Sequence, residues 1–151
     1  MTDLVRNRLA APDVDKGFVL DGFPRTVSQA TALDDILSGA PLIVVLIAVP
    51  DEAIVRRLGN RRVCDSCAIT QSVSMSADAE QEFCPYCGGL LVRRPDDDPE
   101  VVTRRLATYA RFAEPLVDYY RRRPSFASID GQRAFDEVTT ALATHVEAQR
   151  G

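Results

Sequence analysis

Four cysteines, arranged in two pairs, are the residues of this sequence with the clearest chemical use. The pairs are Cys64-x2-Cys67 and Cys84-x2-Cys87, and 16 residues separate them. This spacing is typical of a four-cysteine zinc site, in which each pair forms a tight turn and the two turns enclose one ion. Gly88-Gly89, directly after the second pair, suits such a turn. Four protein ligands leave no open position, so the metal would be structural rather than catalytic.

Two other interpretations of the cysteines are a pair of disulfides and free buried thiols. The first residues show no basic region followed by an apolar stretch, so we expect no secretory signal, and disulfides are uncommon without one. We therefore predict structural zinc that stabilises the surrounding segment, although iron can occupy a four-thiolate site as well.

A second segment with possible chemistry runs from Asp21 to Thr26, after the apolar run Phe18–Leu20. A carboxylate at the end of a buried strand lies at the carboxyl edge of a sheet, where open α/β sheets bind ligands. There Asp21 could hold Mg²⁺ or its waters beside a nucleotide phosphate, and Arg25 could contact phosphate in a bidentate manner. On physical grounds alone, an ordinary strand-to-helix turn explains the same residues.

Length and composition narrow the classes of function. The 151 residues are 46% hydrophobic and 26% charged, which fits one globular domain with a small insertion. The net charge of −4 argues against a general nucleic-acid binder. The longest apolar run, 42–49, is too short for a membrane span of about 20 residues.

Lys16 is the only lysine and Gly17 follows it, so these residues contain no G-x-x-x-x-G-K-[ST] phosphate loop.

The elements that would position these residues alternate between strands and helices. Apolar runs predict strands at 18–20, 42–49 and 126–129, and helical periodicity predicts helices at 3–10, 26–37, 50–58, 99–120 and 135–146. Such alternation indicates an α/β fold, a parallel sheet with helices on both faces. Pro115 should kink or break the fourth helix. Residues 60–95 hold every cysteine and have little periodicity, so we expect them to form a small inserted domain between core segments 1–59 and 96–151.

The order of these motifs resembles the adenylate kinase family. Asp21-Gly22-Phe23-Pro24-Arg25-Thr26, followed by Gln29-Ala30, is similar to that family's signature. Residues 57–63 resemble the beginning of its mobile lid, the cysteine pairs match its zinc-bearing lid subtype, and residues 94–106 resemble the end of the lid. Residues 114–120 and 129–131 also have counterparts. The resemblance covers nearly the whole chain and implies a P-loop-type nucleoside monophosphate kinase sheet with an inserted zinc lid.

The resemblance also implies a reaction and a set of site residues. The family converts ATP and AMP reversibly into two ADP, with Mg²⁺ bound to ATP, and it does so mainly by positioning and charge neutralisation. The residues implied at the AMP site are Gly22, Phe23, Pro24, Arg25, Gln29, Arg94 and Arg105. Those implied at the ATP site are Arg57, Arg61, Thr70, Gln71 and Arg133. Those implied in catalysis are Asp21, Arg61, Arg94 and Arg105.

Some of these assignments carry alternatives. Asp96 and Asp97 would orient the arginines, or they form a solvated acidic turn. Arg57 and Arg61 are four residues apart, so on one helix they would face one ligand together. The family often has an aromatic residue where Gln71 stands. Two further features are expected to be unrelated to the site, namely 121–123 as a solvated helix end and His145 as a surface residue.

The front of the chain departs from the family pattern. The family's first strand, its glycine loop with the lysine and a small AMP-binding segment would all precede residue 1. That strand would lie between 18–20 and 42–49, so we expect two open apolar strand edges, low stability and association through these edges. The simplest explanation is an incomplete sequence of a cytoplasmic enzyme that is a monomer when complete. The two functions to separate are an adenylate kinase that is impaired in this form and a non-catalytic zinc-binding remnant with weak or no nucleotide binding.

Overall fold

A computed structural model describes residues 1–73 and 83–150 of the chain. The chain divides into two compact units, one formed by Met1–Ala48 and Tyr109–Gly151 and the other by Val49–Thr108. We call them unit 1 and unit 2 and describe each by itself. Helix α4, Pro99–Arg121, contributes its first turns to unit 2 and its last turns to unit 1. Among the described residues, no helix combines the length and the apolar character needed to cross a membrane.

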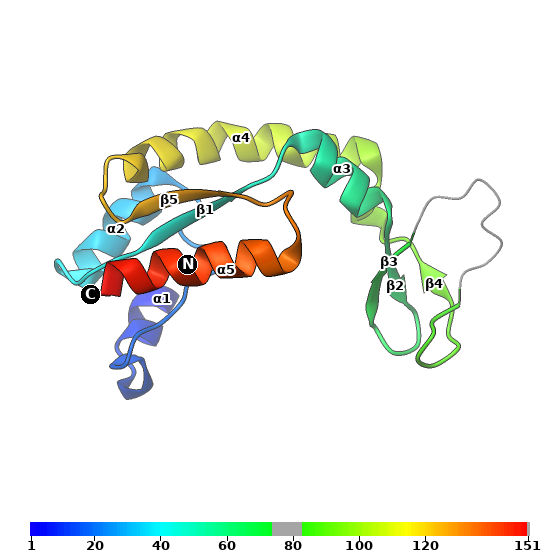
Figure 1. Cartoon of the computed structure of the whole chain (residues 1–151), viewed down its shortest axis with the longest axis horizontal. Helices are drawn as coiled ribbons and strands as arrows, with labels where there is room; N and C mark the ends of the chain where they lie inside the picture. The colour runs from blue at the N-terminus through cyan, green and yellow to red at the C-terminus, as the bar shows by residue number, and fades with distance from the viewer. Residues whose placement is uncertain (74–82, 151) are drawn as a thin grey trace. The chain divides into compact units, whose positions relative to one another are not determined.

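Unit 1 is built on a parallel pair of strands. Strand β1 (Val44–Ala48) pairs with β5 (Phe126–Asp130), in a register that runs from Val44 opposite Phe126 to Ala48 opposite Asp130. The helices of this unit are α1 (Thr2–Leu9), the short 3-10 helix η1 (Pro12–Val14), α2 (Val27–Leu37) and α5 (Phe135–Arg150). Helix α5 runs alongside the strand pair and α1 packs on α2 (Figure 1).

Helix α2 begins and ends where the sequence predicts. The side chain of Thr26 accepts a hydrogen bond of 3.3 Å from the backbone N–H of Gln29, which satisfies one free donor at the start of the helix. Ser38 and Gly39 have left-handed backbone conformations, with φ of 50° and 88°, and so end the helix. On the inner face of α2, Ala30 and Leu33 are fully buried.

Unit 2 combines two helical segments with a small antiparallel sheet. Helix α3 (Asp51–Gly59) leads into strand β2 (Arg61–Cys64), which lies between β3 (Thr70–Ser72) and β4 (Leu91–Val92). Val63 faces Thr70 on one side and Val92 on the other. The 3-10 helix η2 (Pro95–Asp97) then connects the sheet to α4.

One expectation about the fold is wrong: Phe18–Leu20 is not a strand. Val19 is 93% exposed, because within the described residues no neighbouring strand supplies hydrogen bonds to this run. In β1, Ile47 is 49% exposed. Pro115 does not break α4, which continues to Arg121 with Ala113 and Tyr120 buried on either side of the proline.

Candidate metal centre and arginine cluster

The four cysteines lie in two turns of matching geometry in unit 2. In the first turn, the N–H of Cys64 donates to the carbonyl of Ile69 (2.9 Å) and the N–H of Ala68 donates to the carbonyl of Cys64 (3.0 Å). The second turn repeats both bonds twenty residues later: Cys84 N–H to Gly89 (2.8 Å) and Gly88 N–H to Cys84 (2.9 Å). The residue after the second cysteine is left-handed in both, with φ of 59° at Ala68 and 72° at Gly88.

The two turns bring four sulfur atoms together. All four Sγ atoms lie within 4.8 Å of one another, with Cys64 and Cys87 at 3.4 Å and Cys67 and Cys84 at 3.7 Å. A tetrahedral ion with metal–sulfur bonds of about 2.3 Å places its sulfurs about 3.8 Å apart. The separations and the all-thiol donor set therefore fit one four-coordinate ion that prefers sulfur, with no position left for substrate.

The crowding of the thiols changes their acidity. The backbone N–H of Cys67 donates to the sulfur of Cys64 and lowers the pKa of Cys64 to about 7. The backbone N–H of Gly89 acts in the same direction on Cys87, but hydrogen bonding with the sulfurs of Cys64 and Cys67 outweighs it and raises the pKa of Cys87 to about 12. Neighbouring thiolates disfavour one another, and a bound cation would remove that penalty.

Gly89 allows the second turn to approach the first. A Cβ atom built on Gly89 would lie 2.9 Å from the sulfur of Cys64 and 2.5 Å from the hydroxyl of Ser66. Both separations are too short for real contacts, so the close packing of the two turns requires glycine here. The second glycine of the Gly88-Gly89 pair that follows the second C-x2-C motif has this role.

Three of the predicted site arginines in unit 2 gather at the η2 turn. Arg61, the first residue of β2, donates through Nε to Oδ2 of Asp97 (2.8 Å) and through Nη2 to Oδ1. Asp97 is fully buried, so this bidentate pair accounts for its charge, and hydrogen bonding from Arg61 lowers the pKa of Asp97 below its usual value. The interpretation of Asp97 as part of a solvated turn is therefore wrong.

Asp96 accepts hydrogen bonds from the other two arginines, Arg94 and Arg105. Arg94 donates through Nε to Oδ1 of Asp96 (3.1 Å), and Arg105 donates through Nη1 to its backbone carbonyl (3.2 Å). The guanidinium groups of Arg94 and Arg105 also lower the pKa of Asp97 through their charge, after the direct effects of Arg61. Two adjacent aspartates thus hold three guanidinium groups near one another, and the side chains of Arg94 and Arg105 are at least half exposed.

The remaining ATP-side residues of unit 2 occupy other elements. Arg57 is on α3, which ends at Gly59, so it does not share a helix with Arg61 and the expected helical spacing does not apply. Thr70 and Gln71 are on β3, where Gln71 lies opposite Arg62 of β2. Within unit 1, Arg133 forms an ion pair with Glu137 (3.6 Å) in the first turn of α5.

The predicted AMP-side segment forms a compact loop in unit 1. Gly22 has φ of 71°, and its carbonyl accepts a 2.7 Å hydrogen bond from Nε of Arg25. The backbone N–H of Arg25 donates to Oε1 of Gln29 (2.7 Å), so the loop and the start of α2 are joined. A Cβ on Gly22 would lie 3.0 Å from the Arg25 guanidinium. Phe23 and Pro24 are half-buried, whereas Asp21 is exposed.

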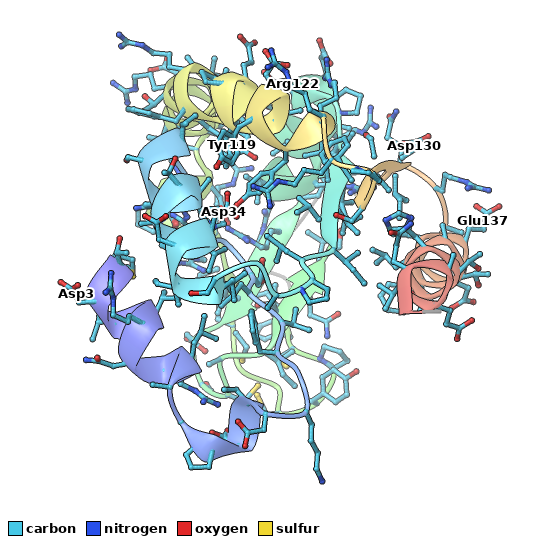
Figure 2. All side chains as sticks on the ribbon, turned by 90° about the vertical axis from the view of Figure 1, so that its left-hand side faces the viewer. Asp3, Asp34, Tyr119, Arg122, Asp130 and Glu137 are labelled. Atoms are coloured by element: carbon cyan, nitrogen blue, oxygen red, sulfur yellow. The ribbon has the colours of Figure 1, made fainter. Side chains whose placement is uncertain are left out.

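One cluster of unit 1 is absent from the sequence-based expectations. Asp34 of α2 accepts a hydrogen bond from the hydroxyl of Tyr119 and forms an ion pair with Arg123. The Arg123 guanidinium lies 5.4 Å and 4.8 Å from the ring centres of Tyr119 and Tyr120. Figure 2 shows Asp34 and Tyr119 pointing toward one another. The expectation of a solvated helix end is therefore wrong for Arg123, because aromatic rings and a carboxylate both surround its charge.

Two other side chains of unit 1 are buried, Tyr120 fully and His145 partly. Tyr120 is 3% exposed, its hydroxyl has no hydrogen-bond partner among the described residues, and burial raises its pKa to about 12. His145 of α5 is half-buried rather than on the surface, and its Nε2 lies 3.2 Å from the carbonyl oxygen of Ser125. This contact joins α5 to the residue that precedes β5.

Comparison with known proteins identifies the family of the chain. A sequence model of a family described as "Adenylate kinase" matches residues 1–125, so the chain belongs to the adenylate kinase family. Adenylate kinase of Acetivibrio thermocellus is 39% identical over 91% of this chain and 64% of the relative. Those of Symbiobacterium thermophilum and Salinispora tropica are 43% identical over 97% and 99% of this chain and 69% and 70% of the relatives. The chain spans about two thirds of the length of these curated relatives.

Proposed function

We propose that the protein acts in nucleotide metabolism in the cytoplasm, as an adenylate kinase that transfers a phosphoryl group reversibly between ATP and AMP to give two ADP. The observation that carries the proposal is the gathering of Arg61, Arg94 and Arg105 at the η2 turn. Phosphoryl transfer needs fixed positive charge around the transferring group more than it needs a nucleophile or a base. Family membership supports the same reaction.

Each group of residues has a proposed task. Arg61, Arg94 and Arg105 would neutralise the charge on the transferring phosphate, and Asp96 and Asp97 would keep these cations in place between turnovers. Mg²⁺, carried in with ATP, supplies further neutralisation, and Asp21 would hold its waters. The AMP-side loop, Gly22 to Arg25 with Gln29, would hold the AMP phosphate and adenine. The proposed ATP-side residues are Arg57, Arg61, Thr70, Gln71 and Arg133.

We further propose that the four cysteines hold one Zn²⁺ ion with a purely structural task. The mutual sulfur separations, all within 4.8 Å, support this assignment. The boundaries we propose are a lid at 60–95 between core segments 1–59 and 96–151, although the compact unit 2 also contains α3 and the first turns of α4. Metal analysis of the purified protein is expected to give about one zinc per chain.

Binding of a bisubstrate analogue, two adenosines joined by five phosphates, tests the arginine assignment. Arg61→Ala, Arg94→Ala and Arg105→Ala should each weaken binding about 10- to 100-fold, since a hydrogen bond to a charged group contributes about 1.5–3 kcal/mol. Arg104→Ala is the matched control, because Arg104 is exposed and adjacent to Arg105. Equal losses for Arg104→Ala and Arg105→Ala would contradict the assignment.

A second candidate, a zinc-binding remnant without turnover, is favoured by one observation, namely that the 151 residues contain no G-x-x-x-x-G-K-[ST] loop. We propose that this polypeptide by itself turns over ADP poorly for that reason. Measurement of ATP formation from ADP, together with analogue binding, separates the candidates. Binding that depends on the arginines supports the kinase site whatever the rate, whereas bound zinc without any nucleotide binding supports the remnant.

A further inference from the structure

The sulfurs of the four-cysteine centre can bind a metal ion as thiolates or join one another as disulfides. Two Sγ–Sγ contacts, Cys64 to Cys87 at 3.4 Å and Cys67 to Cys84 at 3.7 Å, each join a sulfur of one turn to a sulfur of the other. Each pair also combines one buried cysteine, Cys64 or Cys84, with one exposed cysteine. An oxidant in solution can therefore reach a member of both pairs, and in each pair the partner sulfur is already adjacent.

We propose that oxidation by a hydroperoxide converts this centre into two disulfides between the turns, Cys64–Cys87 and Cys67–Cys84, which keep unit 2 closed after the metal has left. In each pair, one sulfur attacks the O–O bond of hydrogen peroxide, takes one oxygen and becomes a sulfenic acid, and the second oxygen leaves as water. The partner sulfur then attacks this sulfenic sulfur, forming the S–S bond and releasing the second water. Each pair of sulfurs therefore loses two electrons and consumes one peroxide, and the two waters take their protons from the thiols or, where zinc held thiolates, from solvent.

The position of the disulfides explains why the fold would survive the loss of the ion. Cys64 is the last residue of β2 and lies opposite Leu91 of β4, and Cys87 lies a few residues before that strand. A Cys64–Cys87 bond therefore closes the loop that the metal otherwise closes and holds the same strand register. Disulfides within each C-x2-C motif, Cys64–Cys67 and Cys84–Cys87, would leave the two turns unconnected. Bonds between the turns restrict the unfolded chain across a longer loop and so stabilise more.

The same strand connects the centre to the proposed phosphate site. Arg61 begins β2 and Cys64 ends it, while β4 is followed directly by Arg93 and Arg94. If the β2–β4 register is kept, Arg61 keeps its hydrogen bonds with Asp97 in the oxidised protein. The inference does not rest on phosphoryl transfer, because disulfide connectivity is read from the chain itself whether or not the protein turns over nucleotide.

The experiment treats the zinc-loaded 151-residue protein with hydrogen peroxide, follows zinc release with a colorimetric chelator, and maps the cysteines by mass spectrometry. Cleavage after glutamate cuts at Glu80 and Glu82, between the two C-x2-C motifs, and at Glu52 and Glu100 on either side of them, so the cysteines fall on fragments 53–80 and 83–100. The expected result is release of the bound zinc with loss of four thiols, and two cysteine-bearing fragments that separate from one another only when a reductant is added. Further cleavage before Asp65 and after Tyr86 should leave Cys64 joined to Cys87 and Cys67 joined to Cys84.

Three outcomes would overturn the proposal. They are fragments that separate without reductant, a map that joins Cys64 to Cys84, and sulfinic or sulfonic products in place of disulfides. A second measurement, hydrogen exchange of the β2 amides, compares the oxidised protein with reduced protein stripped by a chelator. Oxidised protein should keep most of the protection seen with zinc bound, and the reduced, stripped protein should lose it. Equal loss in both would also count against the proposal.

Discussion

The guanidinium of Arg61 and the carboxylate of Asp97 form a bidentate pair across 36 residues of sequence, and the carboxylate has no exposed surface. Arg61 itself is 29% exposed, so one face of the cation stays open to solvent while two of its N–H groups are fixed. A cation held in this way would be oriented before a phosphate reached the proposed site. This arrangement is what electrostatic preorganisation requires.

Replacement of Asp97 by asparagine should separate positioning from charge. Asp97→Asn keeps the size of the side chain but leaves Arg61 with a weaker partner, so unit 2 should lose about 2 kcal/mol of stability. Hydrogen–deuterium exchange of residues 61–64 and 95–97 measures this loss locally. Asp98→Asn is the control, because Asp98 is exposed and its side chain accepts a hydrogen bond from the backbone N–H of Glu100. An unchanged exchange rate in Asp97→Asn would show that the pair contributes nothing to stability.

The same pair predicts a pH dependence of stability. Hydrogen bonding from Arg61 lowers the pKa of Asp97 in the folded protein, so the pair contributes its full stability above the unfolded value of about 3.9. That contribution is lost as the pH falls through the lower, folded pKa, because the folded state must then bind a proton. The difference in unfolding free energy between wild type and Asp97→Asn should therefore be constant from pH 5 to 7 and shrink below about pH 4. A difference that grows toward acid pH would mean that another group is responsible.

In unit 1, Arg123 should matter far more than its neighbour. Arg123→Ala removes an ion pair with Asp34 and contacts with two tyrosine rings, and should destabilise unit 1 by about 1–3 kcal/mol. Arg122→Ala, one residue earlier, should change stability by less than about 0.5 kcal/mol, because Arg122 is exposed. In Figure 2 its label lies on the outer side of α4, away from Asp34. Urea unfolding followed by tyrosine fluorescence compares the two, and equal midpoints would contradict the role of Arg123.

The sequence predicts those features whose cause is local. The cysteine spacing predicts the thiol cluster, and the helical pattern at 26–37 predicts α2, because each depends on residues close together in the sequence. The resemblance to adenylate kinases supplies the identity of the arginines. The arginines gather at η2 because Asp96 and Asp97 bind them. The sequence alone does not decide whether these aspartates orient the arginines or form a solvated turn.

The failures share a different cause, namely partners that are distant in sequence. Phe18–Leu20 has the composition of a strand, but a strand exists only where a neighbour accepts and donates hydrogen bonds, and none is present within the described residues. Arg123 looks like part of a solvated arginine run because its partner, Asp34, lies 89 residues away. Helix α4 continues past Pro115 to Arg121, and Tyr120, beyond the proline, is buried.

Gly89→Ala should disrupt the thiol cluster without changing any sulfur ligand. The added methyl group would overlap the sulfur of Cys64 and the side chain of Ser66, so the two turns must move apart. We expect a weaker hold on zinc, measured as faster transfer of the ion to a chelator, and a lower melting temperature. Gly59→Ala is the control, since nothing lies within 4 Å of the corresponding Cβ position. Unchanged zinc transfer in Gly89→Ala would mean that the turns can absorb the methyl group.

Ala68→Gly should have the opposite effect and stabilise the centre. Ala68 has φ of 59°, a left-handed conformation that costs an L-residue about 1–2 kcal/mol, whereas its counterpart in the second turn is already Gly88. Glycine removes this strain but makes the unfolded chain more flexible, which costs about 0.4–1 kcal/mol, so the net gain should be up to about 1.6 kcal/mol. The hydrogen bond from the N–H of residue 68 to the carbonyl of Cys64 is kept. Chemical unfolding of the zinc-loaded protein measures the gain. Gly88→Ala is the matched reversal and should destabilise, so a change of the same sign in both variants would contradict the shared geometry of the two turns.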